Sequence, residues 1–496
     1  MDIGLDWFKN RRITVMGLGL HGGGLGVAKW LMRRGAALTV TDLKDRTALA
    51  WPLAELDREY RRCLAKPPFG LRPRRVRYRL GEHQEADFRQ AEMVIRNPAV
   101  PRENRLLALA ERNGAWVETD ISLFFHLCPF PIAAVTGTKG KTTVTALLAE
   151  ICRRHDRRTA VGGNIRISPM DSLDRLLRLA ERGADRPPPV VLELSSWQLE
   201  SLEKHGLSPR VAVVTNIMRD HLNRYGGRMA AYAAAKELIV RFQDEQGTAV
   251  LNADDRRLAQ VADRLERRSS GPAVTRFSAR PLRRGDACFA RSGWIYLRRE
   301  GRVEPVLLVS QIRLPGAHNL PNVLAAVAAA AAVGVPVRTI TAATRRFAGV
   351  PGRLETVAAR RGIVYINDTT ATTPDASIAA LKAFSRPGRP SAVLIAGGAD
   401  KDLRFGEWAR AVGRLAKGLV LLDGTATPKM RAALKRAAVK VPIMSASSMS
   451  EAVKLSRGMA GLGDCVILSP GCASFGLFVN EFDRGDRFSA AVRRLR

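Results

Sequence analysis

The sequence predicts an α/β protein of three domains, in which parallel strands alternate with helices. Two observations support this prediction. The chain has 496 residues, which is too many for one hydrophobic core. Three blocks of the sequence each open with an apolar strand followed by a turn that contains glycine. We therefore expect domains at residues 1–118, 119–349 and 350–496.

The first block predicts a Rossmann-like domain. It reads RITVMGLGLHGGGLGVAKWLMRRGAALTVTD, with a strand expected at 13–16, a helix at 24–33 and a second strand at 37–41. Gly17, Gly19 and Gly22 fit the G-x-G-x-x-G pattern, and Asp42 closes the second strand. Such glycines let a backbone approach a diphosphate, and the acidic residue can accept a hydrogen bond from a ribose or base. An NAD-dependent oxidoreductase is one interpretation, and a domain for another nucleotide is the other.

The segment 61–79, RRCLAKPPFGLRPRRVRYR, is basic and contains prolines. Proline interrupts regular secondary structure, so we expect a surface loop or insertion here. We assign it no function.

The second block predicts a central parallel sheet. It opens with PIAAVTGTKGKTT, and the strands expected at 190–194 and 211–217 are apolar along their length, as strands buried on both faces are. Residues 268–310 differ, because WIYLRREGRVEPVLLV alternates and indicates a hairpin at the edge of the sheet. The alanine-rich run 323–337 is too short to span a membrane comfortably, and we expect a buried helix.

The third block predicts another Rossmann-like α/β domain. Four apolar strands alternate with helical stretches, in the segments GIVYIND, SAVLIAGGADKD, GLVLLDG and DCVILSPGCASFG.

The turn GTKGKTT, between an apolar strand and a helix, predicts a phosphate-binding loop. The amides of residues 137–142 can surround an anion, Lys141 can neutralise β- and γ-phosphate charge, and the Thr142 hydroxyl can bind Mg²⁺. Val135 replaces the first glycine of the standard pattern, which removes none of these groups.

Two strands of the second block end in candidate metal ligands. Glu193 ends one strand, and His221 follows another. Ligands of open α/β sheets bind at the carboxyl ends of the strands, so both side chains should face the cleft of Lys141. Asp220 is a weaker candidate, and a surface-loop histidine is the alternative for His221.

The net charge of +33 allows two interpretations. One is an arginine-rich surface, and the other is a nucleic-acid-associated ATPase. No nucleic-acid-binding motif accompanies the charge, so no nucleic-acid partner is expected. The cysteines are dispersed without a CxxC pair and the start lacks a secretory signal, so we expect a cytoplasmic protein without membrane insertion.

The order of the motifs resembles the Mur ligase family over nearly the whole chain. The motifs are GLGLHGGG, GTKGKTT, LELSSWQLE, NIMRDHLNRYG, GAHNLPNVLAA, YINDTTATTPDA, AGGADKD and LSPGCASFGLFVNEFDRGDRF. They are most similar to those of the member that adds glutamate. The resemblance implies a monomeric ligase of peptidoglycan precursor synthesis that uses ATP and two Mg²⁺ ions. Its substrates would be UDP-N-acetylmuramoyl-L-alanine and D-glutamate, joined through an acyl phosphate.

The same resemblance implies roles for individual residues. The catalytic residues would be Lys141, His221, Lys236 and Glu193. ATP would contact Gly137, Thr138, Lys139, Gly140, Lys141, Thr142, Thr143, Asn319, Asn322, Arg353 and Asp368. The UDP-substrate would contact Gly17, Gly19, Leu20, Gly22, Asp42 and Asn164. Glutamate would contact Lys401, Thr372 and Ser474. The metal ligands would be Thr142, Glu193, His221 and carbamylated Lys236.

Two of these residues have plainer alternatives. Lys236, in AAYAAAKELI, would be an exposed helix lysine if the resemblance is set aside. Asn319 could be a helix N-cap instead of an adenine contact.

Four positions depart from the family pattern. Thr370 stands where lysine is common, Gly476 where aspartate is frequent, and Glu481 where an aromatic residue often lies, with Phe482 next to it. These three changes fall close to the expected glutamate pocket, so the alternative is a ligase that adds L-glutamate. Gly352 replaces a family histidine before Arg353, which we expect to be harmless.

Overall fold

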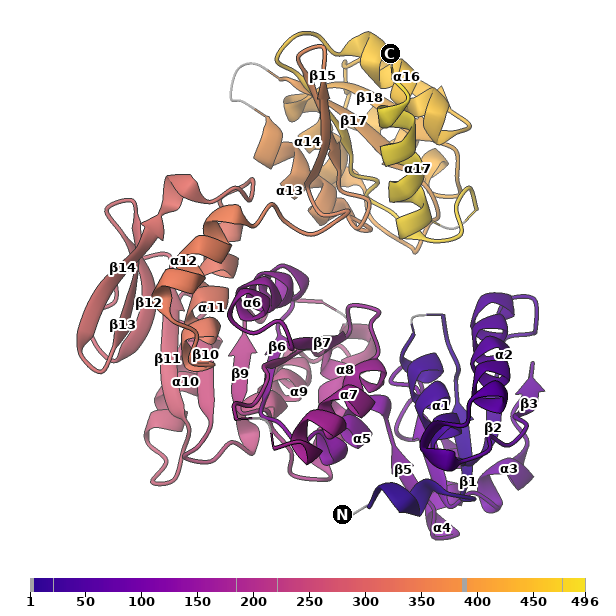
Figure 1. Cartoon of the computed structure of the whole chain (residues 1–496). Coiled ribbons are helices and arrows are strands. Elements are labelled where there is room, and N and C mark those ends of the chain that lie inside the picture. Colours follow the sequence, from indigo (N-terminus) through magenta and orange to yellow (C-terminus); the bar gives the residue numbers. More distant parts are fainter. Residues whose placement is uncertain are drawn as a thin grey trace. The chain divides into compact units, whose positions relative to one another are not determined.

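The computed structural model describes residues 4–20, 22–183, 185–220, 222–385, 390–474 and 476–495 (Figure 1). Its contacts divide the chain into two compact units. The first unit is Met1–Val309 with Pro321–Arg345, and the second is Ser310–Leu320 with Arg346–Arg496. The first unit contains two sheets and the second unit contains one.

The first sheet has five parallel strands in the order β3-β2-β1-β4-β5. The expected strand–helix–strand start is confirmed. The strands are β1 (Arg12–Met16), β2 (Ala37–Asp42), β3 (Arg77–Leu80), β4 (Met93–Arg96) and β5 (Trp116–Glu118). The helices are η1 (Leu5–Phe8), α1 (Gly23–Arg33), α2 (Ala50–Ala65), η2 (Pro68–Gly70), α3 (Glu85–Arg89) and α4 (Arg105–Arg112).

The prediction of a loop over 61–79 is wrong at both ends. Helix α2 continues to Ala65 because it has an apolar face that buries Leu53, Leu56 and Cys63. Two prolines then follow, and the chain returns to the sheet as the edge strand β3. The irregular part is therefore confined to the residues between Ala65 and Arg77.

The second sheet has nine strands in the order β14-β13-β12-β11-β10-β9-β6-β8-β7. Its parallel part is β6 (Ile132–Thr136), β7 (Ala160–Gly163), β8 (Val190–Glu193), β9 (Val211–Val214), β10 (Thr248–Asn252), β11 (Ala273–Ser278) and β12 (Asp286–Arg291). The antiparallel part is β13 (Trp294–Arg299) and β14 (Arg302–Leu308), so the expected hairpin edge is confirmed.

Two tight turns cause this change of direction, so the parallel sheet ends in the antiparallel hairpin that the sequence predicts at its edge. Ser292 and Gly293 have φ of 48° and 78°, and Glu300 and Gly301 have φ of 49° and 77°. Two-residue turns with positive φ at both positions match the twist of an antiparallel hairpin. Each turn therefore reverses the chain within two residues.

Helices pack around the second sheet. They are α5 (Asp120–Leu127), α6 (Lys141–His155), α7 (Met170–Glu181), α8 (Ser196–Glu203), η3 (Leu222–Tyr225), α9 (Met229–Arg241), α10 (Arg256–Glu266), η4 (Val309–Gln311), α11 (Asn319–Ala332) and α12 (Val337–Arg346). The run 323–337 does contain a buried helix, but α11 ends at Ala332. Gly334 then takes φ +89° and Pro336 precedes α12, so the single helix expected there is two.

A buried carboxylate joins the two sheet regions of the first unit. Asp174 of α7 accepts hydrogen bonds from Trp30 Nε1 of α1 at 2.9 Å and from Nη2 of Arg34, the residue that caps the end of α1, at 2.7 Å. One hydrophobic cluster also runs through both regions, from Phe8 to Leu265. The position of the first sheet against the second is therefore fixed by a shared core.

The second unit has a six-stranded sheet in the order β15-β16-β20-β17-β18-β19. The strands are β15 (Glu355–Arg360), β16 (Ile363–Asn367), β17 (Ala392–Gly397), β18 (Ala416–Leu422), β19 (Ile443–Ala446) and β20 (Cys465–Leu468), and all pairs except β15–β16 are parallel. The helices are α13 (Pro374–Phe384), α14 (Gly406–Leu415), α15 (Thr427–Arg436), α16 (Met449–Met459) and α17 (Glu481–Arg493).

Across the described parts of the chain, none of the helices combines the length and apolar character needed to cross a bilayer.

Candidate active site

The chemical groups of the second sheet gather at the carboxyl ends of three adjacent strands, β9, β6 and β8. The phosphate turn follows β6, Glu193 ends β8, and Thr215 with Asn216 follow β9. Parallel neighbours end at the same edge of a sheet, which is where ligands of such sheets bind.

The phosphate turn joins β6 directly to α6. Gly140 is the N-cap residue of α6 with φ +84°, and Lys141 begins the helix. The first amides of a helix have no acceptor inside the helix and carry the positive end of its dipole. Lys141 Nζ donates to the carbonyl oxygens of Gly137 and Thr138 at 3.0 and 3.1 Å, which holds its charge over the turn. Thr142 and Thr143 lie half-buried in the first turn of α6.

Two backbone amides of the turn donate to acceptors within the protein. Fewer amides are therefore left to bind an anion than the sequence predicted. Thr138 N donates to Asn216 O, and Lys139 N donates to Asn216 Oδ1, both at 2.9 Å. Lys139 O in turn accepts from Thr215 Oγ1 at 2.6 Å. No role was predicted for Thr215 or Asn216, although Asn216 opens the motif NIMRDHLNRYG. They fix the shape of the turn and leave the amides at the start of α6 to meet an anion.

Gly137 offers a direct test of this packing. It has φ +146°, and a Cβ atom there would lie 1.9 Å from Thr215 Oγ1. We expect Gly137→Ala to lower the unfolding midpoint by roughly 5 °C more than Gly334→Ala. Gly334 also has positive φ (+89°), but a Cβ atom there would meet nothing within 4 Å, so the control isolates the cost of the backbone conformation. Equal unfolding midpoints for Gly137→Ala and Gly334→Ala in thermal unfolding would show that the turn does not pack as described.

Glu193 is a buried carboxylate with one oxygen left for a cation. Its Oε1 accepts from Asn164 Nδ2 at 2.8 Å, while Oε2 is buried and has no hydrogen-bond donor among the described residues. Burying a charged oxygen without a partner costs several kcal/mol. Carboxylate oxygens are the ligands that Mg²⁺ prefers, so this residue fits a Mg²⁺ ion.

Lys236 reaches the same turn from α9. The side chain is 2% exposed, so the alternative of an exposed helix lysine is wrong. Its Nζ donates to Gly137 O at 2.9 Å, and Lys141 donates to that same oxygen. The pKa of Lys236 is lowered to about 7, mainly by burial and next by the positive charge of Lys141, while Asp220 and then Glu193 act in the opposite direction. Two amino groups therefore converge on one carbonyl oxygen.

His221 lies outside the described residues. Its neighbour Asp220 accepts from Lys139 Nζ at 3.1 Å, so Asp220 lies beside the phosphate turn. Asn322 also lies there, because a Cβ atom at Gly140 would be 2.2 Å from Asn322 Oδ1. Asn319, the first residue of α11, donates its side-chain amide to Pro315 O at 2.7 Å.

The glycine-rich turn of the first sheet is held by Asp42 and Asn97. Asp42 accepts from Gly19 N at 3.1 Å and from Lys44 N at 3.0 Å, so the carboxylate shapes the turn itself. Asn97, which the sequence analysis missed, donates to Gly17 O at 3.2 Å and fills the space beside the glycines. Gly22 caps α1 with φ +91°, and Leu20 is exposed on the turn.

The second unit groups its candidate residues in the same way. Thr372 follows β16, Ser474 follows β20 and Lys401 follows β17, and these three strands are adjacent. Ala399 and Ala473 exchange backbone hydrogen bonds at 2.9 and 3.2 Å, which holds two of the loops together. The predicted glutamate-binding residues therefore lie at one edge of this sheet.

Buried polar groups shape this edge. Asp368 accepts from Ser469 Oγ at 2.8 Å, and burial raises its pKa to about 7. Arg353, which follows the buried Gly352, is exposed. Thr370, which replaces the family lysine, donates a hydrogen bond from Oγ1 to Gly352 O at 3.0 Å. The threonine therefore holds its own loop against the turn at Gly352. Gly476 has φ +105°, a conformation that aspartate adopts only with strain.

Comparisons with known proteins agree with the motif order. Two family models match the chain, the Mur ligase middle domain over residues 135–330 and the Mur ligase, glutamate ligase domain over residues 352–472. A UDP-N-acetylmuramoylalanine–D-glutamate ligase from Roseiflexus sp. (strain RS-1) is 43% identical over 491 residues, which cover 97% of this chain and 98% of that protein. A protein of the same name from Symbiobacterium thermophilum is 37% identical and covers 98% of both chains.

A solved structure supports the fold. The UDP-N-acetylmuramate-alanine ligase of Thermotoga maritima matches with a TM-score of 0.59 over 97% of this chain and 99% of its own, at 20% identity.

Proposed function

The chain belongs to the Mur ligase family, and on that premise we propose that it is the ATP-dependent ligase that adds D-glutamate to UDP-N-acetylmuramoyl-L-alanine in peptidoglycan precursor synthesis. The observation that carries the proposal is the convergence of Lys141 and Lys236 on Gly137 O, at the sheet edge where Glu193 ends β8. The names of the two relatives support D-glutamate over the L-glutamate alternative.

The reaction activates a carboxylate. The carboxylate of UDP-N-acetylmuramoyl-L-alanine takes the γ-phosphoryl group of ATP and becomes an acyl phosphate, with ADP as the leaving group. The amino group of glutamate then attacks the carbonyl carbon, and the tetrahedral intermediate expels phosphate. Positioning and charge neutralisation supply most of the catalysis in the phosphoryl step.

The residues around the turn fit these needs. Lys141 neutralises charge on the γ-phosphate, and the amides at the start of α6 bind phosphate oxygens. The remaining assigned ATP contacts are Gly137, Thr138, Lys139, Thr143, Asn319, Asn322, Arg353 and Asp368.

Two Mg²⁺ ions would be held near the turn, the first by Thr142 and Glu193 and the second by His221 and carbamylated Lys236. When bound, they neutralise the negative charge that accumulates between the phosphate groups and the acid. The unpartnered Oε2 of Glu193 supports the first of these sites.

Carbamylation of Lys236 requires a neutral amine, which adds to CO₂ and releases one proton. The pKa of about 7 leaves a substantial share of the amine neutral near neutral pH. The product is an anion, which removes the repulsion between the ammonium groups of Lys141 and Lys236 and gives a ligand for Mg²⁺.

The two substrates occupy the other grouped residues. The UDP moiety binds at Gly17, Gly19, Leu20, Gly22 and Asp42, and Asn164 lies on the muramoyl side. Glutamate binds at Lys401, Thr372 and Ser474. The three domains are residues 1–118, 119–349 and 350–496, and the protein works as a cytoplasmic monomer.

A phosphate-release assay tests the whole proposal. We expect phosphate from ATP only when Mg²⁺, UDP-N-acetylmuramoyl-L-alanine and D-glutamate are all present, and at least about 100-fold less with L-glutamate. Parallel reactions omit each substrate, and one adds RNA or duplex DNA. Equal hydrolysis without the muramoyl substrate would refute the ligase, and stimulation by nucleic acid would favour an ATPase that acts on it.

A further inference from the structure

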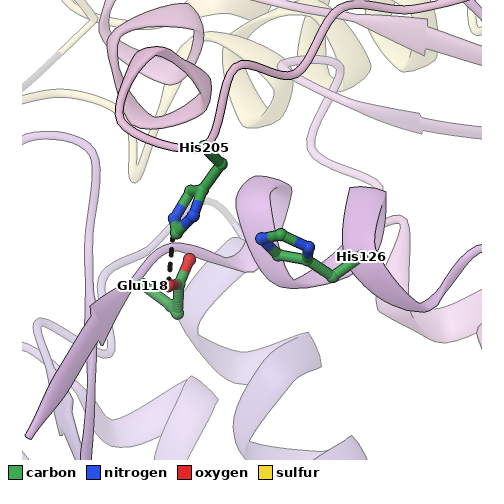
Figure 2. Close-up of side chains that lie close together, drawn as sticks. All are labelled: Glu118, His126 and His205. Carbon is green, nitrogen blue, oxygen red and sulfur yellow. Dashed lines mark ion pairs between the residues drawn. The ribbon is translucent and has the colours of Figure 1, made fainter. Parts of the chain in front are cut away.

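A second group of metal-ligating side chains lies outside the residues assigned to the reaction. Figure 2 shows Glu118, His126 and His205 with their side chains turned toward one another. Glu118 ends β5, His126 lies in the last turn of α5, and His205 follows α8. One ligand atom from each residue lies within 4.8 Å of the other two. Three elements of the first unit therefore meet at this cluster.

The carboxylate of Glu118 lacks hydrogen-bond partners. Its side chain is 0% exposed, and neither oxygen has a hydrogen-bond donor in the part of the chain that the structure describes. Oε1 lies 3.0 Å from His205 Nε2, but the two atoms are not in hydrogen-bond geometry. Burying a carboxylate whose oxygens accept no hydrogen bond is costly, so a cation is expected to complete the cluster.

A protonated His205 alone would satisfy fewer of the buried polar atoms than a metal ion would. It would pair with Oε1 and leave Glu118 Oε2 and His126 Nε2 buried without partners. The rings of His126 and His205 meet edge to face with centroids 4.6 Å apart, so protonating both would bring two cations together. A divalent ion accepts electron pairs from the carboxylate and from both neutral rings at once.

We propose that Glu118, His126 and His205 bind one divalent transition-metal ion of the Zn²⁺ class. Two imidazoles and a carboxylate suit Zn²⁺ better than Mg²⁺, which prefers oxygen ligands. Around a tetrahedral ion with bonds of about 2.0–2.1 Å, ligand atoms lie roughly 3.4 Å apart, so small side-chain rotations close the site. Both histidines are partly exposed, although their Nε2 atoms are buried.

The ion strengthens a junction that hydrogen bonds already hold. Lys204 Nζ donates to Val117 O at 3.0 Å, and Thr119 Oγ1 donates to Ser201 Oγ at 2.9 Å. Both hydrogen bonds join residues at the end of β5 to residues at the end of α8. Because α8 begins at Ser196, shortly after Glu193, the metal fastens the first sheet to the helix that leaves the active site.

Cobalt titration of the full-length, chelator-treated protein tests the proposal. We expect Co²⁺, added in the presence of excess Mg²⁺, to give tetrahedral d–d absorption that saturates at one equivalent and disappears when Zn²⁺ is added. His126→Ala, His205→Ala and Glu118→Gln should each weaken binding at least about 100-fold, because each removes a ligand. His155→Ala removes a histidine at the end of α6, outside the cluster, and should bind like the unchanged protein.

A second measurement covers variants that fold poorly. Zn²⁺ should raise the unfolding midpoint of the unchanged protein and of His155→Ala, but not that of Glu118→Gln, which keeps the shape of the side chain. The proposal is overturned if the unchanged protein shows no tetrahedral cobalt spectrum. It is equally overturned if Glu118→Gln and both histidine variants bind Co²⁺ as tightly as His155→Ala.

Discussion

Replacing Lys236 with alanine is expected to lower kcat for the glutamate-adding reaction about 10³-fold, which corresponds to about 4 kcal/mol of transition-state stabilisation. The side chain is buried, and its Nζ lies 2.9 Å from Gly137 O at the phosphate turn. Alanine removes both the amine and the carbamate that we propose it forms with CO₂. The measurement is steady-state phosphate release with saturating substrates.

Two further conditions separate the carbamate from a structural role. Formate or acetate should restore part of the activity of Lys236→Ala, because a small carboxylate can occupy the space of the carbamate. The unchanged enzyme should lose activity in CO₂-free buffer and regain it with bicarbonate. Glu237→Ala, on the adjacent surface position of α9, is the matched control, because Glu237 pairs with Arg264 instead. Unchanged turnover in Lys236→Ala would rule out the carbamate.

The sequence predicted which side chains lie at the carboxyl edge of the sheet. It did not predict the contacts that hold them in place. Strand ends and glycine turns are local patterns, so the positions of Lys141 and Glu193 followed from the order of parallel strands. The burial of Lys236 did not follow from its own surroundings. Its helix, MAAYAAAKELIVR, is rich in alanine and has no sharply polar face that would show which side meets the core.

The parts of the fold that sequence reasoning misplaced depend on tertiary contacts. The amides of Thr138 and Lys139 donate hydrogen bonds to Asn216, which lies more than 70 residues away in the chain. A local sequence pattern cannot predict a hydrogen bond over that separation. The same limit applies to Glu118 and His205, which different elements bring together. In contrast, the break between α11 and α12 has a local signal in Gly334 and Pro336, which the alanine-rich pattern obscured.

Replacing Lys141 with alanine is expected to lower kcat/KM for ATP about 10³-fold, or about 4 kcal/mol. Its Nζ is held over the turn by Gly137 O and Thr138 O, so in the proposed reaction it would meet the γ-phosphate without further ordering. Lys141→Arg should recover little, because the planar guanidinium does not fit where a compact ammonium binds two carbonyl oxygens. Arg153→Ala, near the far end of α6, is the control and should keep full activity.

The double variant Lys141→Ala/Lys236→Ala makes the stronger test, because the two amino groups share one acceptor. If both act on the same phosphoryl transfer, the double variant should lose much less than the product of the two single losses. The charge of Lys141 also lowers the pKa of Lys236, so removing Lys141 raises that pKa and disfavours the neutral amine that carbamylation needs. Part of the loss in Lys141→Ala should therefore be recovered by raising bicarbonate. Strictly multiplicative losses in the double variant, together with no response of Lys141→Ala to bicarbonate, would show that the two lysines act independently.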